Sequence, residues 1–355
     1  MIERIIADTG GIDPSQHDEL RKSLLLEPAT NIKKSLQGKG MNRYSKNKIK
    51  WLAGFLLFST LGMQSASAQL SYRSGAEIEP GYEGWRPNDD GTFSLLFGYM
   101  NENWEEQPDV QVGDNNFFTP GIADRGQPTH FLPRRNRFTF EVVVPSDWGD
   151  RELVWTITHN GETNKAYGTL VPDYLIDNMV IASETGSLGA GTSSPESRAN
   201  IAPVVSIQGE TVNGTIVRNA RVGEEVILLT QVADDGLPKP RGRTVTRTET
   251  SVQERMMRPP RRTTVGKTNG LFLSWNKFRG PGEVSFEPAQ IKPWEDTRTS
   301  ANSPWGALWV PPTIPDDDMY EVRATFTEPG EYILWARADD GGLYHDQYVT
   351  VNVSP

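Results

Sequence analysis

The amino-acid sequence predicts an all-β protein: two β-sandwich domains joined by a flexible linker and preceded by a signal peptide. Short runs in which apolar and polar residues alternate are separated by Gly, Pro, Asn and Asp, a pattern typical of strands joined by turns. A Gly/Ser-rich stretch lies near the middle of the chain, and the part expected to be mature holds no helix-period segment of ten or more residues. Several short strands at this spacing indicate a sandwich.

Residues 41–68 have the three parts of a secretory signal peptide. Basic residues without an acid come first, an apolar stretch at 51–61 follows, and the small residues Ala66 and Ala68 predict cleavage before Gln69. A membrane-spanning helix needs about 20 apolar residues, and this stretch is much shorter. We therefore expect cleavage and no stable membrane span afterwards, with a retained anchor as the alternative. The basic residues are Arg43, Lys46, Lys48 and Lys50.

A signal peptide normally opens a chain, so we interpret residues 1–40 as a non-native upstream leader and expect translation to begin at Met41. A long cytoplasmic leader is the alternative. The chain contains no cysteine, which excludes a lipid-modified N-terminal cysteine, cysteine-based zinc sites, iron–sulfur clusters and thiol catalysis. A cysteine-free exported protein is typical of bacteria, and we expect it in the periplasm or outside the cell.

The charge is unevenly distributed along the chain. The whole sequence has a net charge of −10, and residues 1–68 contribute +4, so the expected mature part carries −14. Nucleic-acid binding needs a concentrated basic face. The acidic balance therefore argues against a nucleic-acid partner and suits a soluble exported protein.

The first domain is expected at 69–182. Its opening segment, 69–92, is rich in turn residues, because Pro, Gly, Asn and Asp supply the backbone angles that turns need. The Asn160-Gly161 pair between two alternating runs is a strong hairpin signal, since both residues tolerate the left-handed region. The predicted strands are 92–99, 137–144, 152–158 and 165–170.

Residues 183–199 are rich in Gly and Ser and predict a flexible linker. The second domain is expected at 200–355. Seven strands in about 150 residues again indicate a sandwich. They are predicted at 202–207, 223–232, 271–275, 282–286, 321–326, 330–337 and 347–353.

Five strand and turn motifs follow one another in the second domain: Asn200-Ile-Ala-Pro-Val-Val, Asp234-Asp-Gly-Leu-Pro, Gly280-Pro-Gly-Glu-Val-Ser-Phe, Ala324-Thr-Phe-Thr-Glu-Pro-Gly-Glu-Tyr and Ala338-Asp-Asp-Gly. In this order they resemble the polycystic-kidney-disease (PKD) type of immunoglobulin-like domain, and the resemblance covers 200–354. It implies an extracytoplasmic sandwich that acts as a spacer or binding module rather than an enzyme. Insertions at about 241–270 and 287–318 depart from the family, so loop roles are not carried over.

The first domain contains Phe97-Gly-Tyr-Met-Asn-Glu-Asn-Trp-Glu-Glu, Asp114-Asn-Asn and a polar stretch at 124–135. In these segments it is similar to a family of exported bacterial proteins with no assigned function. It implies a structural unit and no particular activity. The two domains together are therefore expected to be immunoglobulin-like β-sandwiches.

A loop-rich stretch of the first domain is the densest candidate ligand site. Arginine forks recognise carboxylates or phosphates, and a nearby aromatic ring can stack on a sugar or another planar group. The alternative is a loop held to the sandwich by its own side chains, with the arginines paired to Glu105 and Glu106. The candidate residues are Trp104, Asn115, Asn116, Gln127, Thr129, His130, Arg134 and Arg135.

A basic insertion interrupts the second domain. Residues 239–267 have a net charge of +7, which leaves −21 on the rest of the mature chain. A basic arm on an acidic body suggests contact with an anionic partner: lipopolysaccharide, an acidic polysaccharide or a neighbouring copy. A solvated loop is the alternative. The expected contact residues are Arg241, Arg243, Arg247, Arg255, Arg258, Arg261 and Arg262.

Metal and carbohydrate chemistry have weaker signals. Acid clusters at 89–90, 234–235, 316–318 and 339–340 could bind calcium, but no EF-hand spacing is present, so no metal and no cofactor are predicted. Tryptophans between 294 and 309 could bind carbohydrate, although such residues more often cover a core.

Catalytic motifs are absent from the sequence. The expected mature chain has three histidines, at 130, 159 and 345, and neither H-E-x-x-H nor G-x-S-x-G. Carboxylate pairs act through spatial rather than sequential closeness, so they stay open. We predict a non-enzymatic binding or structural module of the bacterial cell envelope, with an envelope component or a protein as partner. The alternatives are a carbohydrate-active enzyme or its accessory subunit, and an assembly protein that oligomerises through the basic arm.

Overall fold

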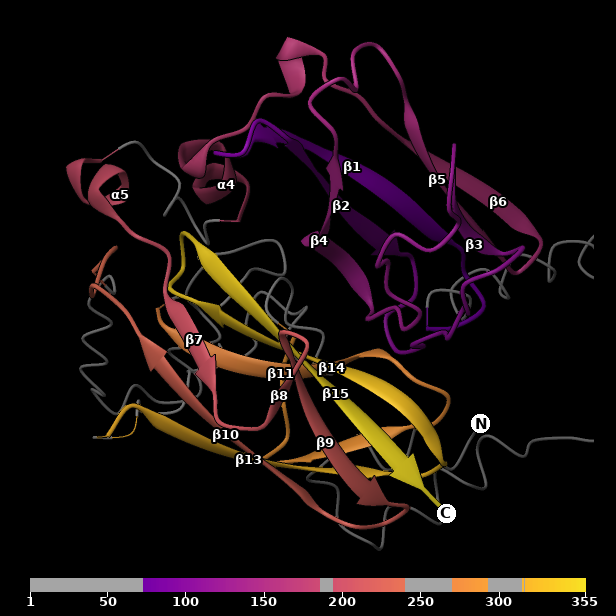
Figure 1. The fold of residues 1–355 in the computed structure, drawn as a ribbon, viewed down its shortest axis with the longest axis vertical. Coiled ribbons are helices and arrows are strands. Elements are labelled where there is room, and N and C mark those ends of the chain that lie inside the picture. Colours follow the sequence, from indigo (N-terminus) through magenta and orange to yellow (C-terminus); the bar gives the residue numbers. More distant parts are fainter. Residues whose placement is uncertain (1–72, 186–193, 240–269, 293–314, 316) are drawn as a thin grey trace, which may run out of the picture. The chain divides into compact units, whose positions relative to one another are not determined.

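Six strands build the first β-sandwich of the computed structural model, which describes residues 73–185, 194–239, 270–292, 315 and 317–355. Two antiparallel three-stranded sheets, in the orders β1-β2-β4 and β3-β5-β6, face each other. The strands are β1 (Ile78–Pro87), β2 (Phe93–Asn101), β3 (Asn116–Thr119), β4 (Arg134–Val144), β5 (Leu153–His159) and β6 (Glu162–Gly168) (Figure 1).

An aromatic cluster joins these two sheets. Phe97 of β2 stacks on Phe140 of β4 with ring centroids 5.7 Å apart. Trp155 of β5 meets Phe140 edge to face at 4.9 Å and stacks on Phe118 of β3 at 5.8 Å. Aromatic rings bury large areas and prefer such tilted or offset pairs. The core of the first sandwich is therefore made by rings from both sheets.

The segment expected to be turn-rich contains a strand instead. β1 runs through the Pro- and Gly-containing stretch from Ile78 and pairs along its length with β2, with a bulge between Tyr82 and Gly84. Proline is tolerated on an edge strand because one side of that strand makes no ladder hydrogen bonds. Partial burial of Tyr82 and Trp85 against the core outweighs the local turn preference.

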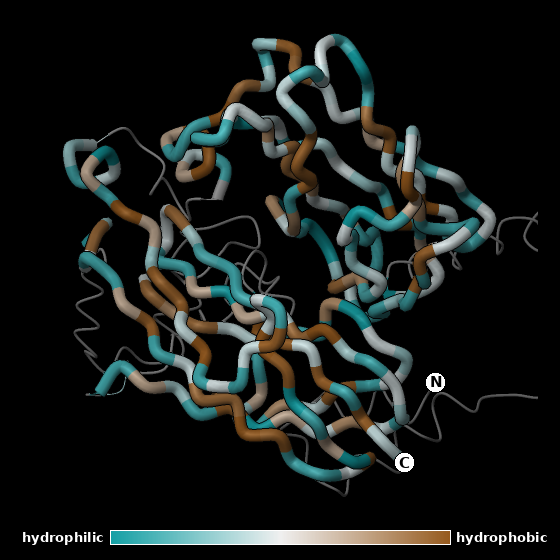
Figure 2. Tube along the Cα trace, in the orientation of Figure 1, coloured by the Kyte–Doolittle hydropathy of each residue, from teal (hydrophilic) through white to brown (hydrophobic). Residues whose placement is uncertain are grey.

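The predicted hairpin is present. β5 and β6 pair from Leu153↔Gly168 to His159↔Glu162, and Asn160 and Gly161 form the turn with φ angles of 51° and 86°. Both values lie in the left-handed region, which Asn and Gly adopt at low cost. Hydrophobic and hydrophilic residues are interspersed along the strands of both sandwiches (Figure 2).

The second sandwich contains the remaining strands. One sheet has the order β12-β13-β10-β7 and the other β11-β14-β15-β9-β8, in which only β9 and β15 are parallel among the described pairs. The strands are β7 (Val204–Ile207), β8 (Thr211–Val212), β9 (Thr215–Arg221), β10 (Val226–Ala233), β11 (Phe272–Arg279), β12 (Val284–Glu287), β13 (Met319–Phe326), β14 (Gly330–Asp339) and β15 (Tyr344–Ser354).

The strand order is that of an immunoglobulin domain. Such a domain places its first, second, fourth and fifth strands in one sheet and its third, sixth and seventh in the other. β7, β10, β12 and β13 form the first of these sheets, and β11, β14 and β15 the second, with β9 added beside β15. The first sandwich follows the same order without the fourth strand. The all-β, immunoglobulin-like fold expected from the sequence is confirmed.

The second core holds together without a disulfide. Antibody domains carry a buried Trp on the third strand and a "tyrosine corner" at the start of the sixth. Trp275 of β11 is fully buried, and Tyr332 of β14 donates its hydroxyl hydrogen to Glu328 O at 2.8 Å and accepts from Gly282 N at 3.0 Å. Leu334, two residues after this tyrosine, is fully buried where antibody domains have their second cysteine.

A bulge in β4 prepares the contact between the two sandwiches. β2 pairs Phe97 with Phe140 and Tyr99 with Asn136, so the extra residues at 137–139 stand out of the ladder. Phe138 has a φ of 47°. Gly98 lies opposite, where an added Cβ would lie 2.4 Å from Asn136 O. The absent side chain of Gly98 therefore lets the bulge close over β2.

In the described part of the connection between the sandwiches lie three short helical segments: η2 (Pro172–Tyr174), α4 (Asn178–Thr185) and α5 (Pro195–Ala199). Within the expected linker, Ser194 caps α5 by accepting a hydrogen bond from Ser197 N, and residues 186–193 lie outside the described part. Flexibility of the linker stays a prediction. No helix among the described residues has the length and apolar character needed to cross a membrane.

Candidate functional site

The outer face of the sheet β11-β14-β15 is covered by the first sandwich, and we call this contact the seam. Phe278 of β11 and Trp335 of β14 belong to the same buried cluster as Phe97 and Trp155 of the first sandwich. The backbone joins in, because the N–H groups of Thr129 and His130 donate to Phe278 O at 3.1 and 3.2 Å. The two sandwiches are thus linked by apolar packing and by main-chain hydrogen bonds.

Arg337 of β14 is the central polar group of the seam. Its side chain is fully buried, and its Nε and Nη2 each lie 2.6 Å from an oxygen of Asp346. The same guanidinium donates to Phe138 O at 2.6 Å and to Arg137 O at 3.3 Å, the carbonyls that the β4 bulge frees. A planar fork can satisfy a carboxylate and two carbonyls together, which a lysine ammonium cannot.

Aromatic rings of β14 and of the neighbouring strand β15 lie against this guanidinium. The Arg337 Cζ atom lies 4.6 Å from the ring centroid of Trp335 and 3.9 Å from that of Tyr344. Trp335 also donates its indole hydrogen to Asp346 at 2.8 Å. Cation–π contacts strengthen when water is excluded. The seam is therefore fixed in register by one buried arginine and its surroundings.

Arg337 and Asp346 both belong to the second sandwich, whereas two ion pairs from β11 cross the seam. Lys277 Nζ lies 2.9 Å from Asp109 Oδ2 and donates to Gly282 O at the same distance. Arg279 binds Asp124 through both terminal nitrogens, at 3.0 and 2.8 Å, and donates to Gln127 O at 2.7 Å. Both cations come from β11, so this strand is bound to the loops of the first sandwich at both positions.

His130 lies beside the first of these pairs. Its Nδ1 is 2.9 Å from Asp109 Oδ1 and its Nε2 is 3.0 Å from the Gln107 side chain. Burial lowers the pKa of His130 more than its hydrogen bond to Asp109 raises it. The atom at Nε2 is Gln107 Oε1, and a neutral ring that donates from Nδ1 must accept at Nε2, so this ring state requires the Gln107 amide to be flipped. Both ring nitrogens are then occupied within the protein.

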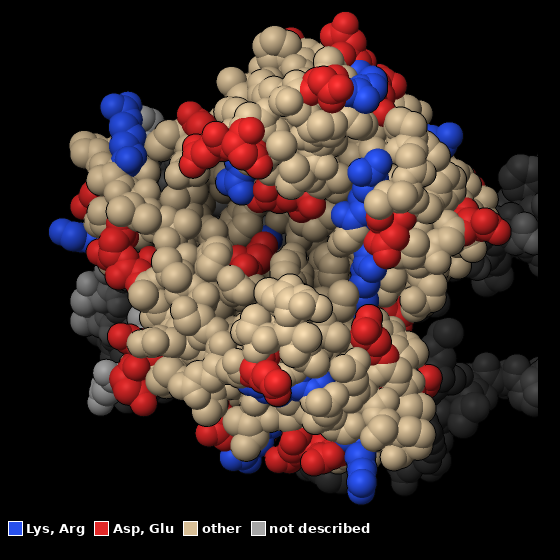
Figure 3. Space-filling model, in the orientation of Figure 1, with Lys and Arg blue, Asp and Glu red and all other residues tan. Residues whose placement is uncertain are grey.

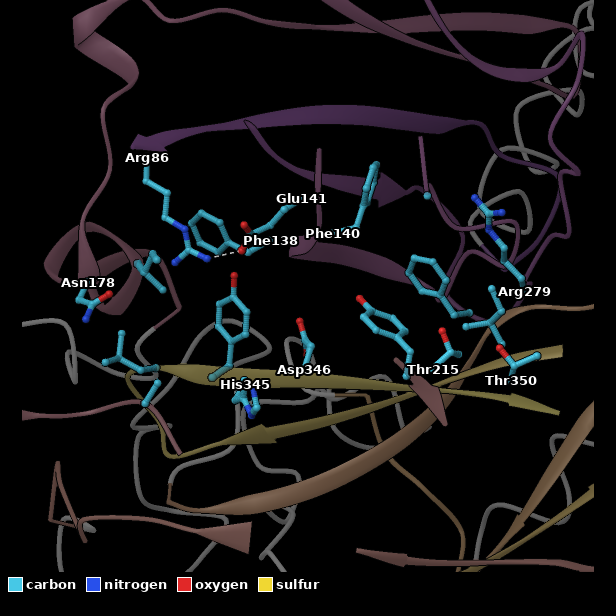
Figure 4. A pocket seen from close by; sticks show the side chains of 18 residues that line it. Arg86, Phe138, Phe140, Glu141, Asn178, Thr215, Arg279, His345, Asp346 and Thr350 are labelled. Atoms are coloured by element: carbon cyan, nitrogen blue, oxygen red, sulfur yellow. Dashed lines mark hydrogen bonds and ion pairs between the residues drawn. The ribbon is translucent and has the colours of Figure 1, made fainter. Parts of the chain in front are cut away.

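A cavity of about 610 Å³ opens along the seam, a size within the usual range for small-molecule sites. Phe138 and Glu141 of β4 line it from the first sandwich, while Asp346 stands on β15 of the second (Figure 4). His345 points away below β15, and its Nδ1 accepts from Val205 N at 2.9 Å. We call this space the seam cavity, and both sandwiches are needed to form it.

Charged groups that line the seam cavity are paired inside the protein. Arg86 bonds to Glu141, as Figure 4 shows. Arg279 pairs with Asp124, and Asp346 with Arg337. Elsewhere on the visible face, acidic and basic side chains are interspersed (Figure 3). The lining therefore combines aromatic and aliphatic surface with polar groups whose charges cancel.

A second cleft, of about 670 Å³, lies beside the Lys277–Asp109 pair. Its lining includes His130, Glu283, Trp275 and Gln290 and is richer in polar groups. Lys277 and His130 are already bonded to Asp109, and Gln290 accepts a hydrogen bond from Trp275 N at 3.0 Å. Its polar groups mainly join the two sandwiches.

Three of the sequence-predicted ligand residues are buried, and the side chains of two of them, Asn116 and Gln127, are bonded mainly to their own loop. Asn116 donates to Val110 O and Pro128 O at 2.9 Å each and accepts from Trp155 Nε1 at 2.9 Å. Gln127 donates to Ala123 O at 3.0 Å and accepts from Arg125 N at 2.7 Å. Thr129 is buried with its backbone in the seam. These contacts match the alternative of a loop held by its own side chains.

The other predicted residues separate into different places. Arg134 lies over Trp104 at 4.7 Å and donates to Glu102 O at 2.7 Å. Arg135 pairs with the buried Glu83 at 2.6 Å. The expected partners of the two arginines, Glu105 and Glu106, bond instead to Arg73 and Gly75 N.

Asn115 is exposed, and His130 lies at the second cleft. None of the eight predicted ligand residues lines the seam cavity. Their role in ligand binding stays a prediction.

The predicted basic contact residues, Arg241 to Arg262, lie outside the described residues, as do the tryptophans between 294 and 309. The acid pairs that fall within the described part close turns of their own: Asp234 and Asp339 accept from Gly236 N and Gly341 N at 2.9 and 2.8 Å. In that part of the chain, no three acidic or histidine side chains are placed to hold a metal ion.

Asp340 gives the fold a pH dependence. Burial raises the pKa of its carboxyl group to about 7, and neighbouring Asp339 adds to the rise. The unfolded value is about 3.9, so the folded state binds this proton more tightly and the free energy of unfolding falls as pH rises from about 4 through 7. Asp340→Asn should remove this fall and raise the free energy of unfolding at pH 8 by about 1–3 kcal/mol.

The amide of this variant also finds a partner. Asn200 Nδ2 lies 3.1 Å from Asp340, and Asn200 Oδ1 has no hydrogen-bond partner within the described ranges, so a flipped Asn200 amide can accept from the new side chain. Urea denaturation at pH 5 and pH 8 tests the expectation. Wild type and variant curves that shift equally with pH would contradict it.

The sequence contains one signal for the seam that its motifs do not show. Tyr344, Asp346, Tyr348 and Thr350 alternate along β15 on the face that an isolated sandwich would turn to solvent. β14 likewise contains the apolar run Tyr332-Ile-Leu-Trp-Ala336, which does not alternate. Strands buried on both faces lose the alternation of a half-exposed strand. Aromatic rings on the outer face of β15 and a non-alternating apolar run in β14 therefore indicate a covered outer face.

Comparisons with known proteins give no family for this chain. No protein-family profile matches it, and no curated protein matches it. Similar solved structures include tandem Ig repeats of Dlar, with 11% identity, 78% of this chain and 97% of that chain covered, and a TM-score of 0.24. Titin domains z1z2 in complex with telethonin match with 8% identity, coverage of 79% and 98%, and a TM-score of 0.20.

A nucleoside hydrolase-related hypothetical protein from Saccharophagus degradans, associated with carbohydrate metabolism, is also similar. It has 13% identity and a TM-score of 0.25, and the match covers 56% of this chain and 37% of that chain. TM-scores this low carry no argument about function. The immunoglobulin-like architecture rests on the strand order within each sandwich.

Proposed function

We propose that this chain is a non-catalytic binding module of the bacterial cell envelope that holds its ligand in the seam cavity. The observation that carries the proposal is the cavity itself: about 610 Å³, lined from both sandwiches, at a contact fixed by the buried Arg337. A preorganised site loses less entropy on binding than one that must first assemble. Ligand sites also lie preferentially at domain interfaces.

The chemistry of the lining supports binding over catalysis. A nucleophile or general base needs a free, positioned side chain. Glu141 and Asp346, the acids of the cavity, are each bonded to an arginine, and His345 is turned toward β7. Export is proposed on the signal peptide at 41–68, with the periplasm or cell exterior as location.

The PKD-type resemblance of the second sandwich suits the same role, since it implies a spacer or binding module. An accessory subunit of a carbohydrate-active enzyme is a second candidate, favoured by the aromatic side chains of the cavity. Contact with an anionic envelope component or a second copy through the basic arm stays a prediction about residues outside the described part.

Cosedimentation of the mature chain, 69–355, with a bacterial envelope fraction tests the proposal. Thr215→Trp places a large ring in the cavity, since Thr215 is an exposed lining residue of β9. Asn352→Trp is the matched control, because Asn352 is exposed on the neighbouring strand β15 and does not line the cavity. We expect wild type and control to sediment with the envelope and Thr215→Trp to stay in solution. Equal behaviour of all three proteins would contradict the proposed site.

A further inference from the structure

We infer that the seam cavity takes an uncharged carbohydrate. The inference rests on the proposed binding function and names the ligand class of the same site. Three properties of the lining carry it: balanced charge, a broad apolar surface and polar groups that both donate and accept. Each property narrows the chemistry of the ligand independently.

Charge balance points to a neutral ligand. The three charged pairs at the cavity are Arg86–Glu141, Arg279–Asp124 and Asp346–Arg337, one cation for each anion. To pair with a guanidinium, an anionic ligand would have to displace that guanidinium's carboxylate. To pair with a carboxylate, a cationic ligand would have to displace the guanidinium. For the fully buried Arg337 this would leave a charge without its partner, at a large desolvation penalty. A ligand without charge leaves all three pairs intact.

The apolar surface of the cavity is largely aromatic. Phe138 of β4 stacks on Tyr344 of β15 with ring centroids 6.2 Å apart, and Phe278 of β11 and Tyr348 of β15 continue the lining. The Phe278 and Tyr348 rings lie 5.2 Å apart at 66° to each other, in edge-to-face contact. The carbon face of a sugar ring, which carries only C–H groups, packs on such surfaces and excludes water from them.

The polar groups of the cavity match hydroxyl groups. Thr215 and Thr350 offer hydroxyls at one end and Asn178 an amide at the other (Figure 4). Glu141 bonds to Arg86 through one carboxylate oxygen and has a second oxygen that can accept. A sugar hydroxyl donates and accepts at once and satisfies such mixed sets, whereas an apolar ligand would leave them without partners.

Together, these properties describe a ligand with no charge, an apolar face and many hydroxyls. The volume of about 610 Å³ accommodates a short oligosaccharide rather than one sugar ring alone. A neutral amphiphile would match the aromatic surface but not the polar groups at both ends. An acidic polysaccharide would match the hydroxyl pattern but not the paired charges.

Periodate treatment of the envelope fraction tests the inference, because periodate cleaves the vicinal diols of sugars. We expect the mature chain to sediment with mock-treated envelope and to stay in solution with oxidised envelope. Isothermal titration then tests whether the ligand is uncharged, with the neutral cellotetraose, xylotetraose and maltotetraose compared against the anionic tetragalacturonate. We expect a neutral tetrasaccharide to bind with a dissociation constant unchanged within about threefold between 50 and 500 mM NaCl.

Two variants and a control test whether the sugar binds in the cavity. Glu141→Ala should weaken the neutral sugar at least about tenfold, the loss expected for a hydrogen bond to a charged group. Thr215→Trp should abolish binding, and Asn352→Trp should leave it unchanged. Glu141 is exposed, so its removal should not unfold the protein.

The outcomes separate the inference from the function that it rests on. Suppose that Thr215→Trp abolishes sedimentation but that the wild-type chain still sediments with periodate-treated envelope. This result would overturn the carbohydrate inference and leave the binding function standing. Preferential, salt-sensitive binding of tetragalacturonate overturns the uncharged ligand. Failure of the wild-type chain to sediment with untreated envelope contradicts the proposed function itself.

Discussion

Arg337→Met should lower the free energy of unfolding by about 3–5 kcal/mol, the loss expected when one partner of a buried ion pair is removed. The substitution leaves the Asp346 carboxylate without its bidentate donor and the carbonyl of Phe138 without its 2.6 Å hydrogen bond. Methionine is similar in length, so lost packing contributes little. Urea denaturation followed by tryptophan fluorescence measures the change.

The same variant should loosen the seam before either core unfolds. Arg337 contacts the first sandwich through the β4 bulge, whereas the aromatic core around Trp155 does not depend on it. Faster hydrogen exchange is therefore expected first at Thr129 and His130, whose N–H groups cross the seam. Arg323→Met, which removes an exposed pair on β13, is the control and should change stability by less than about 1 kcal/mol. Equal losses in the two variants would show that Arg337 has no special role.

Asn116→Ala should lower the free energy of unfolding by about 2–4 kcal/mol and leave ligand binding unchanged. The fully buried amide serves Val110 O, Pro128 O and Trp155 Nε1, and each buried group left without a partner costs about 1–3 kcal/mol. Asn116 was a candidate ligand residue by sequence, so this variant separates a structural role from a binding role. Urea denaturation and envelope cosedimentation are the two measurements.

Asn115→Ala is the matched control for this substitution. Asn115 precedes Asn116 directly and is exposed, and its backbone carbonyl, which accepts from Thr158 N, is kept in the variant. Its removal should change stability by less than about 0.5 kcal/mol. A ligand role for the loop would instead show as weaker cosedimentation in either variant at unchanged stability.

Local pattern was sufficient for much of the fold. The alternating run at 137–144 lies within β4, and Asn160-Gly161 forms the hairpin turn because no tertiary contact competes with its backbone preference. β1 was missed because its Pro and Gly indicate turns, while pairing with β2 and burial beside the core override that preference. β3 was missed because a strand of four residues has too few alternations to be recognised.

The candidate site could not be derived in the same way. A run of amides and arginines in a loop suggests a ligand site, but a loop that passes under its own sandwich needs such side chains to satisfy its backbone. Asn116 and Gln127 serve that purpose. In the sequence, nothing links Arg337 with Asp346, which lie on two different strands. Their register across β14 and β15 brings them together.

The sequence by itself determined most of the strands, the all-β immunoglobulin-like class, and a core that must be stable without disulfides. These follow from periodicity and composition, which act over neighbouring residues. Only the tertiary structure decided that the sheet β11-β14-β15 is covered on both faces, that Arg337 is buried against the β4 bulge, and that a cavity remains beside it. Burial and charge pairing depend on which surfaces meet, and the meeting residues lie about 200 positions apart.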